Sequence, residues 1–228
     1  MQGIRFHPRP PDIAINYRPS VKTVPLFPLG VVLYPGETLP LHIFEDRYHA
    51  LVRHCLETES PFGIVLVRDD EMEDIGCTAL IRNVVDSLED GRSDIVVEGG
   101  ERFRVREIIE REPFLSAAVE EFGDRSDVSS TDMTERLIAQ HIKLLEVAGR
   151  TPSPSRYEGR DPISYFIAHN AGLTLEQKQD ILELRAESER VEYLVRHLEA
   201  FIPAVEEAES IRRKIRTNGH FKDFPPEE

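Results

Sequence analysis

Hydrophobic and polar positions alternate along the first half of the chain with the two-residue period of β-strands. Leu39, Leu41 and Ile43, for example, share one face of an extended segment. Short apolar runs of this kind recur as far as Phe122, and we count about six strands among them. Such a density of short strands favours a small closed or half-closed barrel over a parallel sheet.

Turn residues divide these runs. Pro25, Pro28 and Gly30 interrupt the apolar residues 23–34, which predicts an edge strand followed by a bend. Asp90-Gly91 lies between two β-type runs, and an Asp-Gly pair in that position is the strongest short-range signal for a hairpin. A hairpin is therefore expected with its turn at this pair.

One segment of the first half changes to the period of an α-helix. Asp46 precedes it and is suited to cap the first turn. Four apolar residues then follow at helical spacing, namely Tyr48, Leu51, Val52 and Cys55. The sequence therefore predicts one helix of about three turns among the strands.

The second half follows the helical period almost throughout. Small polar residues at 123–131 predict a linker ahead of it. Capping-box patterns mark two helix starts, at Asp132 with Glu135 and at Thr174 with Gln177. This part of the chain is therefore expected to form a helical bundle.

The expected fold class is α+β, a small β-barrel followed by a C-terminal helical bundle. The expected divisions are a flexible tail at 1–20, a barrel domain at 21–122, a helical domain at 132–216 and a frayed tail at 217–228. Pro203 is expected to kink or restart the last helix, because its ring clashes with the turn before it.

Composition adds little to this picture but excludes some classes. The chain has 228 residues, is 40% hydrophobic and has a net charge of −14, with no basic surplus in either half. That charge argues against nucleic acid as a partner. No apolar run approaches the roughly 20 residues that cross a bilayer, and no secretory signal is present, so we expect a cytoplasmic protein. Its two cysteines, Cys55 and Cys77, sit in apolar patterns and are expected to be buried, reduced thiols.

Several segments of residues 21–202 carry a recognisable set of motifs: PLFPLGVVLYPGETLPLHIFEDRY, the Phe-Gly pair of PFGIVLV, IGCTALI, the residues Gly100, Arg102, Phe103 and Val105, and DPISYFIAHNAGLTLEQKQDILEL. In these segments the chain resembles the amino-terminal substrate-recognition domain of Lon proteases. The resemblance implies a β-rich core of the type called PUA-like, packed on or followed by helices. In whole Lon proteases this region helps to engage unfolded or tagged substrates and to assemble the hexamer.

Two departures from a whole Lon protease bear on activity. The chain contains no Gly-Lys dipeptide, so it has no P-loop for a nucleotide phosphate. It also ends before a Ser-Lys peptidase domain has room. We therefore expect no ATP-dependent proteolysis by this polypeptide alone, and no cofactor or metal. The expected function is a non-catalytic module that binds extended or unfolded polypeptide segments or a protein partner. The oligomeric state stays open.

Phe44, Glu45, Arg47 and Tyr48 lie where a strand meets the predicted helix. One interpretation makes them a polar corner of a binding groove. The other makes Glu45 a partner for free backbone N–H groups, with Arg47 and Tyr48 fixing the helix to the barrel.

Arg102, Arg104 and Arg106 alternate along one predicted strand and therefore point to one face. They either pair with nearby acidic residues such as Glu98 and Glu101, or form a basic stripe for an acidic peptide or an RNA backbone. RNA binding through the PUA-like core is the alternative function, although the chain has no tryptophan for base stacking.

A third possibility is a small enzyme or a metal-dependent factor. Candidate ligands cluster at His42, Glu45, His49, His54 and Cys55. The two helical histidines are five residues apart, however, whereas a metal pair on one helix face needs i, i+4 spacing. Cys55 as a nucleophile would need a neighbouring base, and its apolar stripe favours the core instead.

Overall fold

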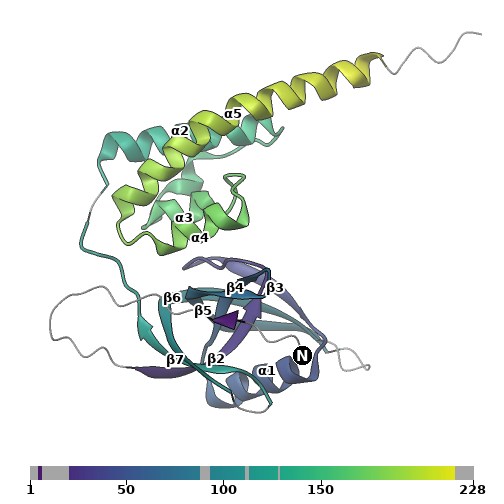
Figure 1. The fold of residues 1–228 in the computed structure, drawn as a ribbon. Coiled ribbons are helices and arrows are strands. Elements are labelled where there is room, and N and C mark those ends of the chain that lie inside the picture. Colours follow the sequence, from purple (N-terminus) through teal and green to yellow (C-terminus); the bar gives the residue numbers. More distant parts are fainter. Residues whose placement is uncertain (1–4, 7–20, 88–92, 111–112, 128, 219–228) are drawn as a thin grey trace, which may run out of the picture. The chain divides into compact units, whose positions relative to one another are not determined.

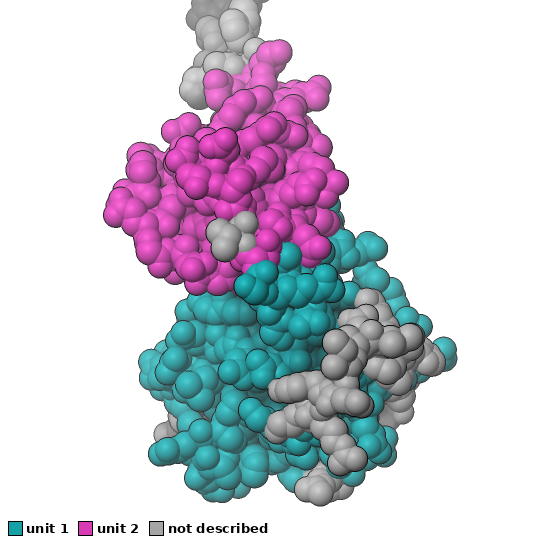
Figure 2. Space-filling model, turned by 90° about the vertical axis from the view of Figure 1, so that its left-hand side faces the viewer, with its two compact units in different colours: residues 1–126, 173–186 teal, residues 127–172, 187–228 magenta. Residues whose placement is uncertain are grey.

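The computed structural model describes residues 5–6, 21–87, 93–110, 113–127 and 129–218. The chain forms two compact units, coloured separately in Figure 2: unit 1 holds residues 1–126 and 173–186, and unit 2 holds residues 127–172 and 187–228. The expected tails at 1–20 and 217–228 lie outside the described residues, except for a two-residue strand near the start and the last two residues of the final helix.

Unit 1 is built on a seven-stranded sheet (Figure 1). Its strands are β1 (Arg5–Phe6), β2 (Lys22–Leu29), β3 (Thr38–Ile43), β4 (Phe62–Arg68), β5 (Glu71–Ser87), β6 (Ser93–Ile109) and β7 (Ser116–Glu121). The order is β1-β5-β4-β2-β7-β6-β3, and β5 also pairs with β6. Five strands thus follow one another in a ring of pairings. The mixed α+β class is confirmed, but the sheet is not a clean closed barrel, because β1 and β3 pair outside this ring.

The prediction of an edge strand for β2 is wrong. Its first half, Lys22–Pro25, pairs antiparallel with β7, and its second half, Leu26–Leu29, pairs parallel with β4. Each half is therefore paired mainly on one side. This stagger explains how Pro25 and Pro28, which lack the N–H that a ladder needs on both sides, occur in an internal strand.

The hairpin predicted at Asp90-Gly91 is confirmed by its strands, whereas the turn itself lies outside the described residues. β5 and β6 pair antiparallel from Ile75↔Arg104 to Ser87↔Ser93. Strand β6 is a single long strand that continues through Gly99 and Gly100.

The one helix expected among the strands is α1 (Asp46–Thr58), and its N-cap is Glu45 rather than Asp46. Its apolar face packs into the core of unit 1 with residues of β2, β4, β5 and β6. Cys55 and Cys77 belong to that core, which confirms their predicted burial. Burial raises the pKa of the Cys55 thiol to about 11 and that of the Cys77 thiol to about 12. Both thiols are therefore protonated at neutral pH.

Helix α4 (Leu175–Glu183) belongs to unit 1, although the segments on both sides of it belong to unit 2. Gln179 Nε2 donates to the carbonyl oxygen of Ile75 in β5, at 3.1 Å, and the Tyr34 hydroxyl donates to the Lys178 carbonyl oxygen, at 3.0 Å. The capping box predicted at its start is confirmed. The expected domain boundaries, which place α4 in a helical domain at 132–216, stay a prediction, and the two compact units divide the chain differently.

Unit 2 consists of α2 (Thr131–Val147), the 3₁₀ turn η1 (Pro154–Tyr157), α3 (Ile163–Ala168) and α5 (Glu187–Asn218). Ser130, rather than Asp132, caps α2 by accepting from the Met133 N–H. α5 runs through Pro203 as one helix. None of the described helices is long and apolar enough to cross a membrane.

His141 of α2 is buried in unit 2, with only 2% of its surface exposed. Its Nδ1 lies 2.9 Å from the Tyr157 hydroxyl, and its Nε2 has no partner among the described residues. Burial, together with the nearby Arg156 charge, lowers the pKa of His141 to about 4 from its ordinary 6.5. The folded state therefore resists protonation that the unfolded chain accepts.

We expect unit 2 to lose stability as the pH falls from about 6.5 to about 4, because the unfolded state binds a proton there and the folded state does not. The difference should reach about 2 to 3 kcal/mol at pH 4. Urea unfolding of wild type and His141→Gln across this range measures it, since glutamine keeps an acceptor for Tyr157 but cannot titrate. Parallel pH profiles for the two proteins would contradict the prediction.

Candidate functional site

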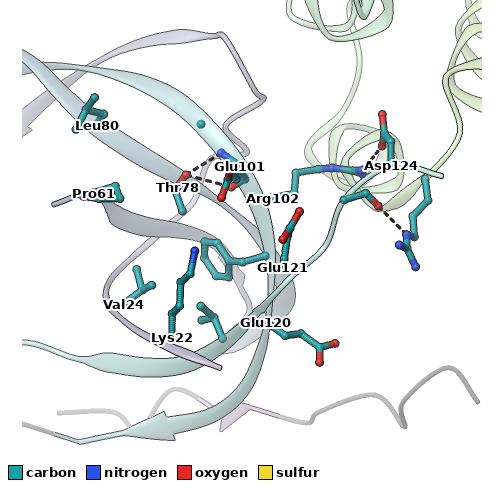
Figure 3. Close-up of a pocket in the computed structure, with 15 residues that line it drawn as sticks. Lys22, Val24, Pro61, Thr78, Leu80, Glu101, Arg102, Glu120, Glu121 and Asp124 are labelled. Atoms are coloured by element: carbon teal, nitrogen blue, oxygen red, sulfur yellow. Dashed lines mark hydrogen bonds and ion pairs between the residues drawn. The ribbon is translucent and has the colours of Figure 1, made fainter. Parts of the chain in front are cut away.

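Unit 1 contains an open pocket of about 600 Å³ on the surface of its sheet (Figure 3). Apolar side chains of four strands line its inner wall, namely Val24, Leu80, Phe103 and Val119. Lys22 and Val24 lie on one side of it, Thr78 and Leu80 on another, and Glu121 on a third. Strands β2, β5, β6 and β7 all contribute, so the pocket is a product of the sheet and not of one loop.

A local irregularity of the sheet shapes this wall. The β5–β6 register shifts between Cys77 and Ala79. Thr78 Oγ1 accepts from the Glu101 N–H at 2.8 Å and donates to the Glu101 carbonyl oxygen at 3.1 Å, as the dashed lines in Figure 3 show. A Cβ on Gly100 would lie 2.6 Å from Thr78 Oγ1, so only glycine fits opposite this side chain. The bulge therefore directs Glu101 to the pocket rim.

Some charged side chains on the rim form ion pairs within unit 1, and others do not. Lys22, Glu101 and Glu121 are exposed, and none of them forms an ion pair with the described residues. Glu120 and Asp124, by contrast, pair with arginines of unit 1. The rim thus offers one ammonium and two carboxylates to a ligand, beside an apolar wall. A fourth charged group, the half-buried Arg185 guanidinium, also lines the pocket and donates from Nε to the Gly123 carbonyl oxygen at 2.9 Å.

Arg102 lines the pocket, but its guanidinium is bonded to other groups of unit 1 and not directed to a ligand. The side chain is buried, and its Nη1 donates to the carbonyl oxygens of Leu182, at 2.6 Å, and Leu184, at 2.7 Å. Its Nη2 donates to Asp124. The two carbonyls lie at the C-terminal end of α4, where helix acceptors lack intrahelical donors and the dipole favours a cation. Arg102 therefore fastens α4 to β6.

The other arginines of the predicted stripe are also paired. Arg104 Nε lies 3.6 Å from Asp74, and Arg106 donates to Glu120. The three arginines therefore pair with acidic residues, as one of the two interpretations holds. The partners differ from the expected ones, since Glu98 pairs with Arg82 instead, at 2.7 Å. The stripe carries no surplus of positive charge, and RNA binding loses the sequence feature on which it depended.

The strand-to-helix corner is a second, separate cluster. Glu45 and Arg47 form an ion pair at 2.7 Å, and the Arg47 guanidinium lies 4.5 Å from the centre of the Tyr48 ring. Tyr48 is 8% exposed and packs on Phe27 with ring centres 3.9 Å apart, and burial raises the pKa of its hydroxyl. The contact with Phe27 fits the interpretation in which Tyr48 fixes α1 to the sheet. The part of that interpretation that concerns Glu45 is wrong, because its side chain makes no hydrogen bond to the helix start and pairs with Arg47 instead.

Phe44 differs from the rest of the corner, because 66% of its surface is exposed. It stacks on His42, whose Nδ1 lies 2.6 Å from Asp94. None of the four corner residues lines the pocket. The structure therefore brings Arg102, but not the corner, to the pocket, and all six predicted site residues remain predictions as ligand contacts.

The suggested metal ligands at His42, Glu45, His49, His54 and Cys55 do not form a cluster of three within ligand reach in the described part of the chain. The group that does is Glu73, Asp74 and Glu183, with ligand atoms within 4.8 Å of one another. Arg104 already supplies a positive charge beside Asp74. We therefore assign no metal to it.

Sequence reasoning missed Lys22, Thr78 and Glu121, because each comes from a different strand. One signal was available in Gly99-Gly100, since paired glycines inside a strand indicate a bulge or a close backbone approach. Gly99 indeed faces the Tyr34 backbone, and a Cβ there would clash with its carbonyl oxygen.

A family model described as the ATP-dependent protease La (LON) substrate-binding domain matches residues 23–200. Among curated relatives, the Lon protease of Flavobacterium johnsoniae is 24% identical over 85% of this chain and 26% of its own length. The Lon protease of Anaeromyxobacter dehalogenans is 29% identical over 76% of this chain and 22% of its own length. This chain thus spans about a quarter of the length of these relatives.

Solved structures show the same fold. A Lon N-terminal domain protein from Xanthomonas campestris is 28% identical, with a TM-score of 0.61, over 76% of this chain and 97% of that one. The N-terminal domain of a Mycobacterium avium complex Lon protease, at 20% identity and a TM-score of 0.58, covers 78% of this chain and 98% of that one.

Proposed function

Because this chain belongs to the family of LON substrate-binding domains, we propose that it is a non-catalytic module that binds extended or unfolded polypeptide segments. The matching family model is that of the substrate-binding domain, and the chain spans about a quarter of the length of the Lon proteases that it matches. A PUA-like core and a cytoplasmic location are parts of the same proposal. Polypeptide as the ligand class is supported by the family.

The pocket of unit 1 is the observation that carries the proposal. Its inner wall is apolar, and its rim presents Lys22, Glu101 and Glu121, whose charges no described residue neutralises. Ligand pockets combine an apolar lining with a few polar groups that fix the orientation of the ligand. An extended polypeptide segment matches both features, because its apolar side chains can contact the wall while its backbone amides and carbonyls bond to the polar groups.

We envisage one apolar side chain of the ligand against Val24 and Leu80. Backbone N–H groups of the segment then donate to the carboxylates of Glu101 or Glu121, and the Lys22 ammonium donates to a backbone carbonyl. Contacts with the ligand backbone do not depend on its sequence, which suits a module that receives many polypeptides. Such a segment extends from the pocket toward β3, which among the described strands pairs with β6 alone.

Charge reversal at the rim tests this assignment. We expect the double variant Glu101→Lys, Glu121→Lys to bind fluorescein-labelled denatured casein about tenfold more weakly than wild type, a loss of about 1.4 kcal/mol. Both side chains are exposed, so folding should be retained, which a thermal melt checks. Fluorescence anisotropy at physiological ionic strength measures the affinity.

The matched control is Glu57→Lys, Glu59→Lys, which makes the same change in net charge at exposed positions at the end of α1. It should bind casein like wild type. Equal losses for both double variants would show a general electrostatic effect and remove the pocket from the proposal. A wild-type protein that binds no unfolded chain at all would remove the proposed function.

A further inference from the structure

The pocket of unit 1 opens at one end of the ring of strands formed by β2, β4, β5, β6 and β7. β2 and β4 are parallel, so their first residues lie at the same end of the ring, and β7 is antiparallel to β2, so its last residues lie there too. Lys22 is the first residue of β2, Pro61 directly precedes β4, and Glu121 is the last residue of β7. All three line the pocket, which is therefore the mouth of the ring.

The mouth is blind, because packed side chains of the core close it at its floor. Val24, Phe103 and Val119 line the pocket, are buried and belong to one apolar cluster with other residues of the ring. A Cβ on Gly63 or Gly76 would lie 2.6 or 2.8 Å from the Phe103 ring, so this ring has no free space behind it. A ligand can therefore insert one side chain or one chain end, but a continuous segment cannot thread through the ring.

Two exposed carboxylates, neither of them in an ion pair with the described residues, stand close together on the rim. Glu121 of β7 pairs with Phe103 of β6, and Glu101 precedes Phe103 by two residues, so the two glutamates are diagonal neighbours across these strands. Diagonal neighbours in regular strands are about 7 to 8 Å apart. One ammonium group, whose N–H groups donate to different acceptors, can therefore bond to both carboxylates and offset their mutual repulsion.

Lys22 adds a donor of the opposite charge to the same rim. It lies opposite Val119 of β7, two residues before Glu121, and its exposed ammonium forms no ion pair with the described residues. Figure 3 shows Lys22, Glu101 and Glu121 around one opening. The mouth thus combines an apolar floor with two acceptors and one donor at its edge.

We propose that the mouth binds the free amino terminus of a polypeptide whose first residue is large and apolar, an inference that rests on the proposed polypeptide-binding function. The first side chain lies on the apolar floor, the α-ammonium donates to Glu101 and Glu121, and Lys22 donates to the first carbonyl oxygen. The volume of about 600 Å³ accommodates such a residue with its backbone. The rest of the ligand leaves the mouth, so its sequence is not selected there.

A chain end matches the mouth better than the other groups that a polypeptide offers. An internal backbone N–H is neutral, so it leaves the charges of both carboxylates uncompensated once the ligand excludes water from the rim. A lysine side chain carries its charge at the far end of its stem, so an inserted lysine would place its ammonium against Phe103 and Val119, away from the rim. In an amino-terminal residue the ammonium and the side chain leave the same Cα, which places one at the rim and the other on the floor.

Forms of one short peptide test this inference. The peptide begins with leucine, continues with serine and glycine and carries fluorescein at its carboxyl end. We expect the full chain to bind the acetylated form about tenfold more weakly than the form with a free amino terminus, because acetylation removes the charge. A free form that begins with serine should also bind about tenfold more weakly, because it buries no apolar side chain. Fluorescence anisotropy at physiological ionic strength measures these affinities.

An acetylated form with lysine directly after the leucine separates a chain end from a basic side chain. It should bind as weakly as the acetylated parent peptide, because its ammonium does not leave the same Cα as the inserted side chain. Binding as tight as that of the free amino terminus would show that the rim accepts any cation of the ligand, and would overturn the inference.

Two double variants locate the effect in the protein. Glu101→Gln, Glu121→Gln should bind the free and the acetylated peptide equally, because glutamine keeps the shape of glutamate and loses its charge. Glu57→Gln, Glu59→Gln removes the same charge at exposed positions at the end of α1 and should keep the tenfold preference for the free form. A preference that survives in the first variant would overturn the inference.

Denatured casein separates this inference from the proposed function. Wild-type protein that binds casein but does not prefer the free peptide to the acetylated one would overturn the inference and leave the proposed function in place. Wild-type protein that binds neither casein nor the peptide would remove both.

Discussion

Replacing Arg102 by alanine is expected to lower the free energy of unfolding of unit 1 by about 3 to 5 kcal/mol. The substitution removes a buried donor from the carbonyl oxygens of Leu182 and Leu184 and an ion-pair partner from Asp124. It also empties the volume of a side chain that is 3% exposed. Urea unfolding followed by circular dichroism measures the change.

Arg82→Ala is the matched control, since Arg82 is also a strand arginine with a carboxylate partner, Glu98, at 2.7 Å. Its side chain is 54% exposed, and exposed pairs contribute only about 0 to 1 kcal/mol. A small loss of stability for Arg102→Ala, similar to that of Arg82→Ala, together with a loss of casein binding, would return Arg102 to the role of a ligand contact.

Replacing Arg190 by methionine is expected to destabilise unit 2 by about 3 to 5 kcal/mol. Arg190 is fully buried in α5, donates to Glu187 at 2.9 Å and to Ser164 Oγ at 2.9 Å, and lies 4.5 Å from the centre of the Tyr165 ring. Methionine fills much of the same volume, so the loss reflects the carboxylate of Glu187 left without its buried cation. Thermal unfolding of the variant checks this.

The double variant Arg190→Met, Glu187→Gln should recover part of the lost stability, because it no longer buries an uncompensated charge. The two oxygens of Glu187 accept from the Ser164 N–H, at 3.0 Å, and from its hydroxyl, at 2.5 Å. Glutamine keeps one acceptor oxygen for the N–H, and its amide NH₂ donates to the hydroxyl oxygen. A double variant that is less stable than Arg190→Met would show that the Glu187 carboxylate is stabilising without Arg190.

Elements that depend on nearby residues could be predicted from the sequence. The helical spacing from Tyr48 to Cys55 identified α1, and Thr174 with Gln177 identified the start of α4. The Asp-Gly signal identified the β5–β6 hairpin. In each case the physical cause, a buried stripe, a cap or a tight turn, lies within a few residues of the chain.

Features that depend on distant partners could not be predicted in this way. Two prolines argued for an edge strand, and only the staggered pairing with β7 and β4 explains why β2 is internal. The period of two placed Arg102 and Arg104 on one face, but their partners come from α4, β5 and the segment after β7. The pocket likewise joins residues of four strands.

The position of α4 in the chain has a consequence for biosynthesis. Unit 1 takes its last segment, residues 173–186, from beyond the first part of unit 2. A ribosome therefore releases the sheet strands and residues 127–172 before the acceptors of Arg102 at Leu182 and Leu184 emerge. During that interval the nascent sheet lacks α4, so the hydrogen bonds between Arg102 and the end of α4 form only late in translation.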